Sequence, residues 1–179
     1  MNLKQLLFLT VIPIFSTSLS YSQTKFVEQK AGHIIYMSVP DYMTKTTSLN
    51  DVASMQYMNK TKEAYVVVIE DAKEDLEAEG TKYNSLKEFH DSVIEILKSE
   101  DPKAEESKPT EFQQNGNKFY QTDLYATLQT EDGKDIKVTY LVTYVESKTH
   151  YYQILCWTLA SSYKDLVADF KKTASTIRD

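Results

Sequence analysis

Residues 118–159 read KFYQTDLYATLQTEDGKDIKVTYLVTYVESKTHYYQILCWTL, and this stretch decides the fold. It divides into three segments with the patterning of β-strands, over residues 118–129, 135–146 and 149–159. The connections between them are short and polar, and the first contains Asp132-Gly133, a pair that tolerates the positive φ of a tight hairpin. Because short connections force neighbouring strands to be antiparallel, the sequence predicts a meander at the centre of a sheet.

The three segments differ in the pattern of their apolar residues. The first alternates apolar and polar positions, which predicts one dry face and one wetter face. The second is apolar on both faces, because Val138, Tyr140 and Val142 share one face while Leu141 and Val145 occupy the other. A strand that is dry on both sides is usually central and covered on each face. The third segment is rich in aromatic and branched residues, which suit a pleated surface.

Further strand signals lie upstream of the meander. Asn115-Gly116 is a tight-turn pair, and it predicts a hairpin between residues 110–114 and the start of the first long strand. The apolar run over residues 65–69 is uninterrupted, which indicates another inner strand. The predicted upstream strands cover residues 32–40, 52–58, 64–70 and 110–114, with a Thr-rich loop over residues 41–50.

Two segments carry helix signals. Ser85 and Glu88 match a capping box, in which both side chains accept hydrogen bonds from backbone N–H groups at a helix start. Apolar residues then recur at helical spacing, which predicts an amphipathic helix to about Ser99. Ser161-Ser162 is the predicted start of the last helix. Its buried stripe is predicted to be Leu166, Phe170, Thr173 and Ile177.

This order of elements predicts an α+β fold. Its core is an antiparallel sheet of about six or seven strands flanked by two main helices. Residues 99–108 and the acidic run over residues 70–79 are predicted to be polar surface loops. Residues 23–179 are predicted to form one domain, since a chain of this length fits one domain.

The first 22 residues have the pattern of a secretory signal peptide. Lys4 gives a positive start, residues 6–14 are largely apolar, and Ser20 and Ser22 are the small residues before a cleavage site. The apolar run is too short to cross a hydrocarbon core of roughly 30 Å. We therefore expect cleavage after Ser22 and an exported, periplasmic or extracellular protein with no integral membrane segment. An uncleaved anchor is the alternative.

The chain is acidic, with a formal net charge of −6. Nucleic-acid binding needs clustered Lys and Arg against phosphates, and this sequence has no basic stripe. Its charge also argues against adhesion to an anionic membrane surface. A nucleic acid is therefore not expected among the partners.

The three histidines, His33, His90 and His150, show no metal-ligand spacing. A metal site would need them brought together in a fixed geometry. We expect three unconnected surface or rim histidines, and no cofactor or metal residue is predicted.

Cys156 is the only cysteine, so an internal disulfide cannot form. A catalytic thiol needs a neighbouring base and a partly open, electropositive setting. Cys156 instead lies among apolar residues of a predicted strand, so we expect a buried core residue.

The acidic run over residues 70–79 could bind Ca²⁺ through carboxylate oxygens. It lacks the alternating ligands and central glycine of an EF-hand loop, so a solvated loop is the preferred interpretation.

Thirteen tyrosines are many for this length. Tyrosine is common in strands and at interfaces, because it combines apolar area with a polar tip. Ordinary use in strands and core is the simpler interpretation, and the alternative is that some of them line a groove or contact face. The meander contains Tyr120, Tyr125, Tyr140, Tyr144, Tyr151 and Tyr152.

The order of elements resembles the PsbP-like family, which includes the photosystem II extrinsic subunit and the bacterial periplasmic protein DcrB. The likeness covers residues 32–178. It is carried by Val39-Pro40 closing the first strand, by the segment 85–89 opening a helix, and by residues 151–158 leading into a Ser-capped helix. The chain departs from the family at Tyr42-Met43, where many relatives carry Gly-Trp. The resemblance implies a PsbP-like α/β/α sandwich and a non-enzymatic binding or assembly role.

These observations predict an exported, non-enzymatic binding or assembly module that contacts a protein partner through a sheet face or loops. The alternatives are a carrier of small molecules or metal ions and, less favoured, a hydrolase whose residues come from distant strands. No catalytic residue is predicted, and the binding residues, partner and oligomeric state stay open.

Overall fold

The computed structural model describes residues 23–32, 35–99, 101–130 and 132–179. The predicted signal peptide and His33 lie outside these residues. The strands of the main sheet are β3 (Thr44–Lys45), β4 (Met55–Asn59), β5 (Ala64–Ala72), β6 (Glu105–Glu106), β7 (Thr110–Gln114), β8 (Asn117–Gln129), β9 (Asp135–Glu146) and β10 (His150–Leu159). Their order is β3-β4-β5-β10-β9-β8-β6, with β7 also paired to β8, and every pair is antiparallel. The predicted α+β class is confirmed, with eight strands in the described sheet rather than six or seven.

The predicted meander is confirmed. β8 pairs with β9 along its length, and β9 pairs with β10. The hairpin that joins β7 to β8 turns at Asn115 and Gly116, whose φ angles of 53° and 82° are those a tight hairpin requires. β5 lies between β4 and β10, as its uninterrupted apolar sequence predicts for an inner strand.

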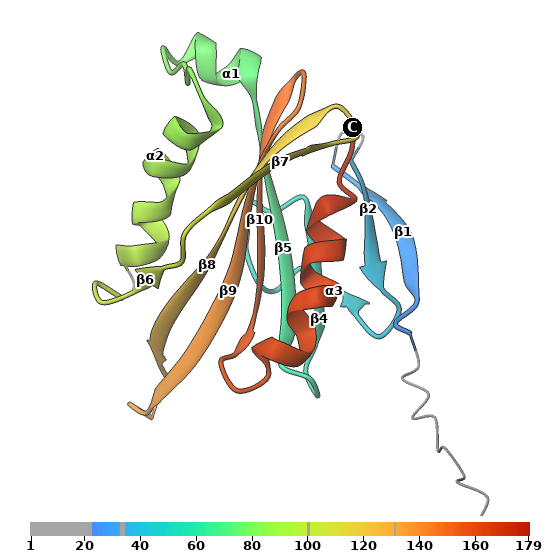
Figure 1. Ribbon diagram of the computed structural model, residues 1–179, viewed down its shortest axis with the longest axis vertical. Coiled ribbons are helices and arrows are strands. Elements are labelled where there is room, and N and C mark those ends of the chain that lie inside the picture. The colour runs from blue at the N-terminus through green and yellow to red at the C-terminus, as the bar shows by residue number, and fades with distance from the viewer. Residues whose placement is uncertain (1–22, 33–34, 100, 131) are drawn as a thin grey trace, which may run out of the picture.

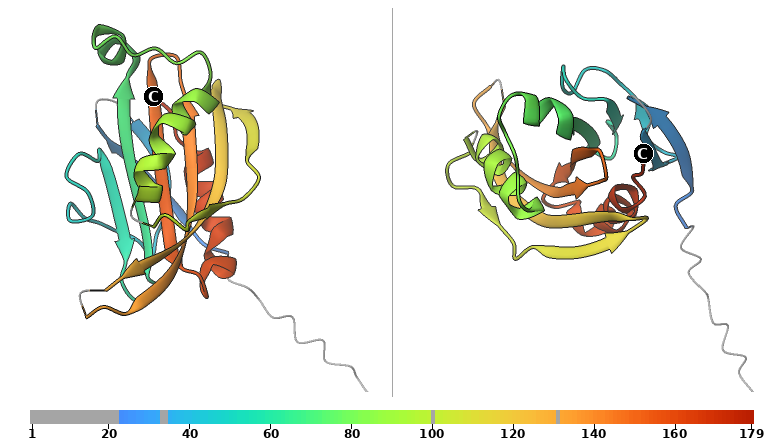
Figure 2. Two further views of the ribbon diagram at one scale, coloured as in Figure 1. Left: turned by 90° about the vertical axis from the view of Figure 1, so that its left-hand side faces the viewer. Right: turned by 90° about the horizontal axis from the view of Figure 1, so that it is seen from above.

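Helices cover both faces of the sheet (Figures 1 and 2). On one side, the α2 face, lie α1 (Lys73–Ala78) and α2 (Leu86–Ser99). On the other, the α3 face, lie α3 (Tyr163–Ser175) and a hairpin of β1 (Phe26–Ala31) and β2 (Ile35–Pro40). β9 supplies both cores, because Val142 and Tyr144 point to the α2 face and Leu141 and Val145 to the α3 face.

The sequence predicts the second strand of the β1–β2 hairpin but not the first. β2 does not enter the main sheet but pairs with β1 in a separate two-stranded sheet. Its apolar side chains pack into the α3-face core, and its other edge is bridged by Arg178, which exchanges two backbone hydrogen bonds with Tyr36 (2.8 and 3.0 Å). None of the residues of β1, whose sequence is FVEQKA, is buried, and no clear apolar alternation marks it as a strand.

Three segments predicted to be loops contain short elements. The acidic run over residues 70–79 is not a loop, because it ends β5 and then forms α1. Glu74 and Asp75 lie in the first turn of α1, where carboxylates complement the helix dipole. β3 lies within residues 41–50 and β6 within residues 99–108. A strand of two residues has no alternation to detect, because period 2 becomes visible only over several residues.

The wetter face predicted for the first long strand is wrong for its first half. Residues 119–122 are all buried, so both faces of β8 are covered here. The polar members of this run are hydrogen-bonded. Gln121 Nε2 donates to Thr143 Oγ1 at 2.8 Å, and Thr122 Oγ1 donates to the Ser107 carbonyl at 2.9 Å. Satisfied polar groups can be buried at little cost, and the hydrophobic pattern does not reveal such pairs.

The two main helices begin where the sequence predicts. The backbone N–H of Glu88 donates to Ser85 Oγ at 3.1 Å, which confirms the Ser85 half of the predicted capping box. The Glu88 carboxylate accepts from the backbone N–H of Asn84 at 2.8 Å, one residue before the predicted donor. α3 follows Ser162, but the Ser162 side chain makes no cap hydrogen bond. The residues predicted for the stripe of α3 are buried, although Ile177 lies beyond the end of the helix at Ser175.

Candidate functional site

An apolar groove of about 270 Å³ opens on the α2 face, at the end of the sheet where β8 turns into β9 (lower end in Figure 1). We call it the aromatic groove. Strands β5, β8, β9 and β10 and their ends line it through Glu63, Tyr65, Leu128, Gln129, Thr130, Ile136, Val138, Trp157, Thr158 and Leu159. The side chains that face it from the strands are mainly aromatic and aliphatic, which is the usual lining of a binding site.

The strand register builds a row of rings at the groove. Trp157 on β10 is the direct partner of Tyr65 on β5 and of Tyr140 on β9. The Tyr65 and Trp157 ring centroids are 5.1 Å apart with planes at 18°, and those of Trp157 and Tyr140 are 5.7 Å apart at 30°. Because directly opposed residues point to the same face, three rings from segments far apart in sequence stack in one line.

The row of rings lies on the α2 face, beyond the part of that face that helix α2 covers. α2 buries Phe89 and Ile94 against the sheet. Along β10, Leu155 is 8% exposed, but Trp157, two positions on, is only half-buried. Likewise on β9, Val142 is fully buried and Tyr140 is half-buried. The same strand faces are therefore covered beneath α2 and open beyond it.

One carboxylate stands at the rim of the aromatic groove. Tyr65 donates its hydroxyl hydrogen to Glu63 Oε2 at 2.5 Å. Burial, together with this hydrogen bond, raises the pKa of Tyr65 to about 12, so the phenol stays protonated at neutral pH. The site can thus offer apolar area, with a single negative charge, that of Glu63, among its lining residues.

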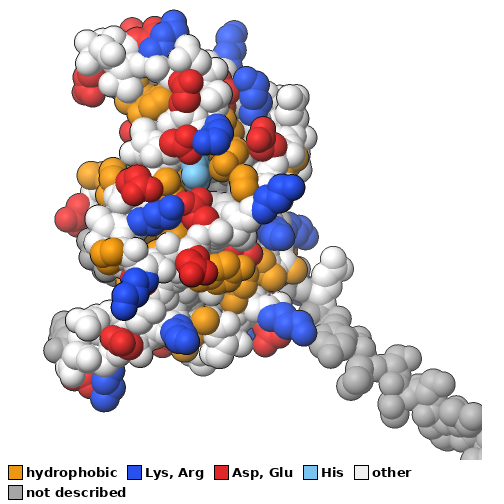
Figure 3. Space-filling model, turned by 60° about the vertical axis from the view of Figure 1, so that its left-hand side comes forward, with side chains coloured by type: hydrophobic (Ala, Val, Ile, Leu, Met, Phe, Trp, Pro, Cys, Tyr) orange, Lys and Arg blue, Asp and Glu red, His pale blue; other side chains and the backbone are white. Residues whose placement is uncertain are grey.

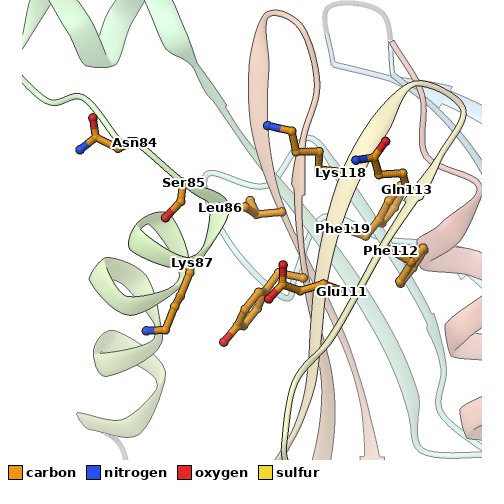
Figure 4. Close-up of a pocket in the computed structure, with 10 residues that line it drawn as sticks. Asn84, Ser85, Leu86, Lys87, Glu111, Phe112, Gln113, Lys118 and Phe119 are labelled. Atoms are coloured by element: carbon orange, nitrogen blue, oxygen red, sulfur yellow. The ribbon is translucent and has the colours of Figure 1, made fainter.

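A second cleft, of about 340 Å³, lies between the first turn of α2 and strands β7 and β8 (Figure 4). Lys87 and Lys118 line it, but both cations are already paired. Lys87 Nζ lies 2.5 Å from Asp91, and Lys118 Nζ lies 3.0 Å from Glu146. With its lysines engaged internally, this cleft is a weaker candidate for a charged ligand than its composition indicates.

His90 departs from the prediction of a surface or rim histidine. Its side chain is 6% exposed and lies between Asp91 and Glu106. His150 lies at the start of β10, apart from His90. No group of three or more His, Cys, Asp or Glu among the described residues could hold a metal ion.

Ser147, His150 and Asp179 are the nearest approach to a hydrolytic constellation in the described part of the chain. Ser147 Oγ donates to Asp179 Oδ2 at 2.7 Å, and His150 Nδ1 is 3.9 Å from the same oxygen. In a serine hydrolase the imidazole accepts the serine proton and the carboxylate orients the imidazole. Here the serine hydroxyl is directed at the carboxylate, so the arrangement is that of an anchor for Asp179.

Cys156 is fully buried in the α3-face core, as predicted. Burial raises the pKa of its thiol, which disfavours the reactive thiolate. A nucleophilic role for this residue has no support in its surroundings.

Charges of both signs are mixed on one face of the molecule. On the face shown in Figure 3, acidic and basic side chains are interspersed, with hydrophobic side chains between them. Phosphate backbones are bound by clustered cations, and this face shows no such cluster. None of the helices in the described residues is long and apolar enough to cross a membrane.

Comparisons with known proteins establish the fold. No protein-family model matches the chain, and no curated protein sequence matches it. The solution structure of cyanobacterial PsbP (CyanoP) from Synechocystis sp. PCC 6803 matches with a TM-score of 0.62 and 9% identity, over 89% of this chain and 95% of that one. The crystal structure of LpqN, involved in cell envelope biogenesis of Mycobacterium tuberculosis, matches with a TM-score of 0.54 and 13% identity, over 87% and 91%. The predicted resemblance to PsbP-like proteins is confirmed at the level of the fold.

Proposed function

We propose that this PsbP-like fold serves as an exported, non-enzymatic binding module that holds an apolar segment of a protein partner in the aromatic groove. The observation that carries the proposal is the half-buried row of Tyr65, Trp157 and Tyr140 where the α2 face is open. Tyr and Trp are the residues most enriched at protein interfaces and their energetic centres.

The orientation of the rings favours a protein segment over a planar ligand. Each ring of the row turns its face to its neighbour, so the faces between them are already used. Trp157, in the middle of the row, has a ring against each face, so toward a ligand it can present only its edge, which carries positive partial charge. Ring edges and aliphatic walls suit aliphatic side chains and backbone carbonyls better than they suit a flat ring that needs a free face for stacking.

The size of the groove supports the same choice. Its volume of about 270 Å³ is below the usual range of small-molecule pockets, roughly 300–1,000 Å³. A groove of this size accommodates one or two aliphatic side chains of a larger partner. An extracytoplasmic location is part of the proposal, and it is supported by the signal-peptide pattern of residues 1–22.

The test is site-specific photo-crosslinking in the exported fraction of the native organism. A photoreactive residue in place of Leu159, in the groove, should give one discrete protein adduct. The same residue in place of Val27, which is 48% exposed on β1, should give none. Adding Leu128→Glu to the Leu159 probe should reduce the adduct about tenfold, because a carboxylate buried against apolar surface is costly.

Equal amounts of adduct from the probes at Leu159 and Val27 would contradict the proposal. So would an adduct at Leu159 whose amount does not change with Leu128→Glu. Native mass spectrometry of the protein from the same fraction distinguishes a carrier of small molecules from a protein-binding module. A reproducible small-molecule mass lost on denaturation, without a protein adduct, would assign the groove to a carrier instead.

A further inference from the structure

His90 joins α2 to the sheet through both nitrogens of its ring. Nδ1 lies 2.9 Å from Asp91 Oδ1, and Nε2 lies 3.0 Å from Glu106 Oε2. Asp91 follows His90 on α2, whereas Glu106 belongs to β6, which pairs with β8. The imidazole is therefore a link between the helix and the edge of the main sheet.

Each of the two carboxylates also receives a lysine on its other oxygen. Lys87 Nζ lies 2.5 Å from Asp91 Oδ2, and Lys98 Nζ lies 2.5 Å from Glu106 Oε1. The hydrogen bond from Lys87, with a further one from His90, lowers the pKa of Asp91. The hydrogen bond to Glu106 raises the pKa of Lys98. Each carboxylate therefore accepts from a lysine ammonium on one oxygen and faces the imidazole with the other.

The number of protons that these contacts require determines the protonation state of the cluster. A neutral imidazole carries one N–H, so it can donate to one carboxylate and must turn a lone pair to the other. Both short contacts are favourable only when the imidazole is doubly protonated or when a carboxyl shares the second proton. In either case, the cluster carries one extra proton when α2 is docked. The reference is a neutral imidazole between two ionised carboxylates.

The remaining groups around His90 come from the sheet. The Tyr120 ring on β8 lies 4.7 Å from the imidazole, and the Tyr144 ring on β9 meets it edge-on at 5.1 Å. Burial raises the pKa of both tyrosines, so they stay neutral. Lys87 and Lys98 oppose a positive charge here, while Asp91 and Glu106 favour it and contact the ring directly.

We infer that the docking of α2 on the sheet is coupled to the uptake of one proton by the cluster of His90, Asp91 and Glu106. When that proton leaves, one carboxylate contact becomes a repulsion between lone pairs in a buried site, and the helix loosens. Docking that takes up a proton is favoured at low pH and weakens as the pH rises. This inference concerns α2 alone and stands whether or not the aromatic groove has a partner.

Loosening of α2 would change the surface of the molecule. The helix covers Tyr144 and Leu155, which lie on the same strand faces as the row of Tyr140 and Trp157. Tyr144 Oη is buried without a hydrogen-bond partner among the described residues, so exposure to water relieves a cost that docking imposes. The apolar strip on the α2 face would then extend upward from the groove.

Two measurements on the wild-type protein test the inference. Imidazole ¹⁵N chemical shifts at pH 6 should show His90 with both nitrogens protonated. Hydrogen-exchange protection factors of residues 86–99 should fall by up to tenfold per pH unit above the transition, as one linked proton requires, while those of β9 and β10 stay constant. Protection that does not change with pH would overturn the inference, and so would a neutral His90 between two ionised carboxylates at pH 6 with α2 still protected.

Variants separate the proton linkage from a simple loss of packing. In Glu106→Gln, the amide N–H₂ can donate to a neutral His90 and the amide oxygen can still accept from Lys98. This variant should keep α2 protected at pH 8, where the wild type has lost protection. His150→Gln, a histidine change away from α2, should behave as the wild type. Loss of α2 protection in Glu106→Gln at pH 8 as large as in the wild type would refute the mechanism.

Discussion

Among single residues, Gly32 is the most tightly constrained glycine of the described chain. Its φ is +62°, and a Cβ there would lie 2.7 Å from Glu70 Oε1 and 2.9 Å from Ile35 Cδ1. The Glu70 carboxylate accepts a hydrogen bond from Ser54 Oγ at 2.5 Å, and Ile35 is fully buried. Neither neighbour can move away without losing a contact of its own.

Gly32→Ala should therefore lower the free energy of unfolding by about 2–4 kcal/mol, combining left-handed backbone strain with overpacking. Chemical denaturation of the purified protein measures this difference. Gly133→Ala is the matched control, because φ is +77° but nothing lies within 4 Å of its Cβ position, so only about 1–2 kcal/mol of backbone strain is expected. Equal losses for the two variants would show that the crowding at Gly32 is not real.

Asp179 is held by three hydroxyl donors, from Ser147 (2.7 Å), Tyr152 (3.0 Å) and Thr149 (3.1 Å). Burial alone would raise its pKa, but these hydrogen bonds outweigh burial and lower the pKa. A lowered pKa stabilises the fold above the ordinary pKa of Asp, near 3.9, and this contribution is lost as the pH falls through the lowered value.

We expect Asp179→Asn to cost about 1–3 kcal/mol at pH 7 and less at about pH 3, because the contribution of the carboxylate declines below the ordinary pKa of Asp. Urea unfolding at the two pH values checks this dependence. Asp51→Asn, in an exposed loop, should change stability by less than about 0.5 kcal/mol at both. A loss that is the same at both pH values would mean that charge plays no part at Asp179.

Among the elements, the two main helices share a serine before the first turn but differ in what it does. Ser85 accepts a backbone hydrogen bond, whereas the Ser162 side chain makes no cap hydrogen bond. Ser85→Ala should therefore cost about 1 kcal/mol, and Ser162→Ala less than about 0.5 kcal/mol. Denaturant midpoints of the two variants provide the comparison, and a larger loss for Ser162→Ala would contradict the assignment of the caps.

The elements that the sequence predicts are those whose signals are local. Asn115-Gly116 and the apolar run of β5 determine a turn and an inner strand from neighbouring residues. β3 and β6 escape prediction because two residues carry no period. β1 escapes because its place depends on β2 and Arg178, whose partnership is visible only in three dimensions.

For the molecule as a whole, the candidate site was harder to predict than the fold. The tyrosines of the meander indicate a possible contact face, and Tyr140 does belong to the aromatic row. Tyr65 and Trp157 carry no such signal, because their meeting depends on the register between β5 and β10. The burial of His90 depends in the same way on Glu106, which reaches it from another segment.

The pairing of Arg178 with Tyr36 also has a consequence for the order in which the chain can fold. The backbone bridge joins β2, which is synthesised early, to Arg178, which is synthesised near the end. During synthesis or transport from the N-terminus, the edge of β2 and the α3-face core must wait for residues 163–178. Long-range closure of this kind slows folding, so this edge of β2 stays unpaired until the last residues of the chain have been made.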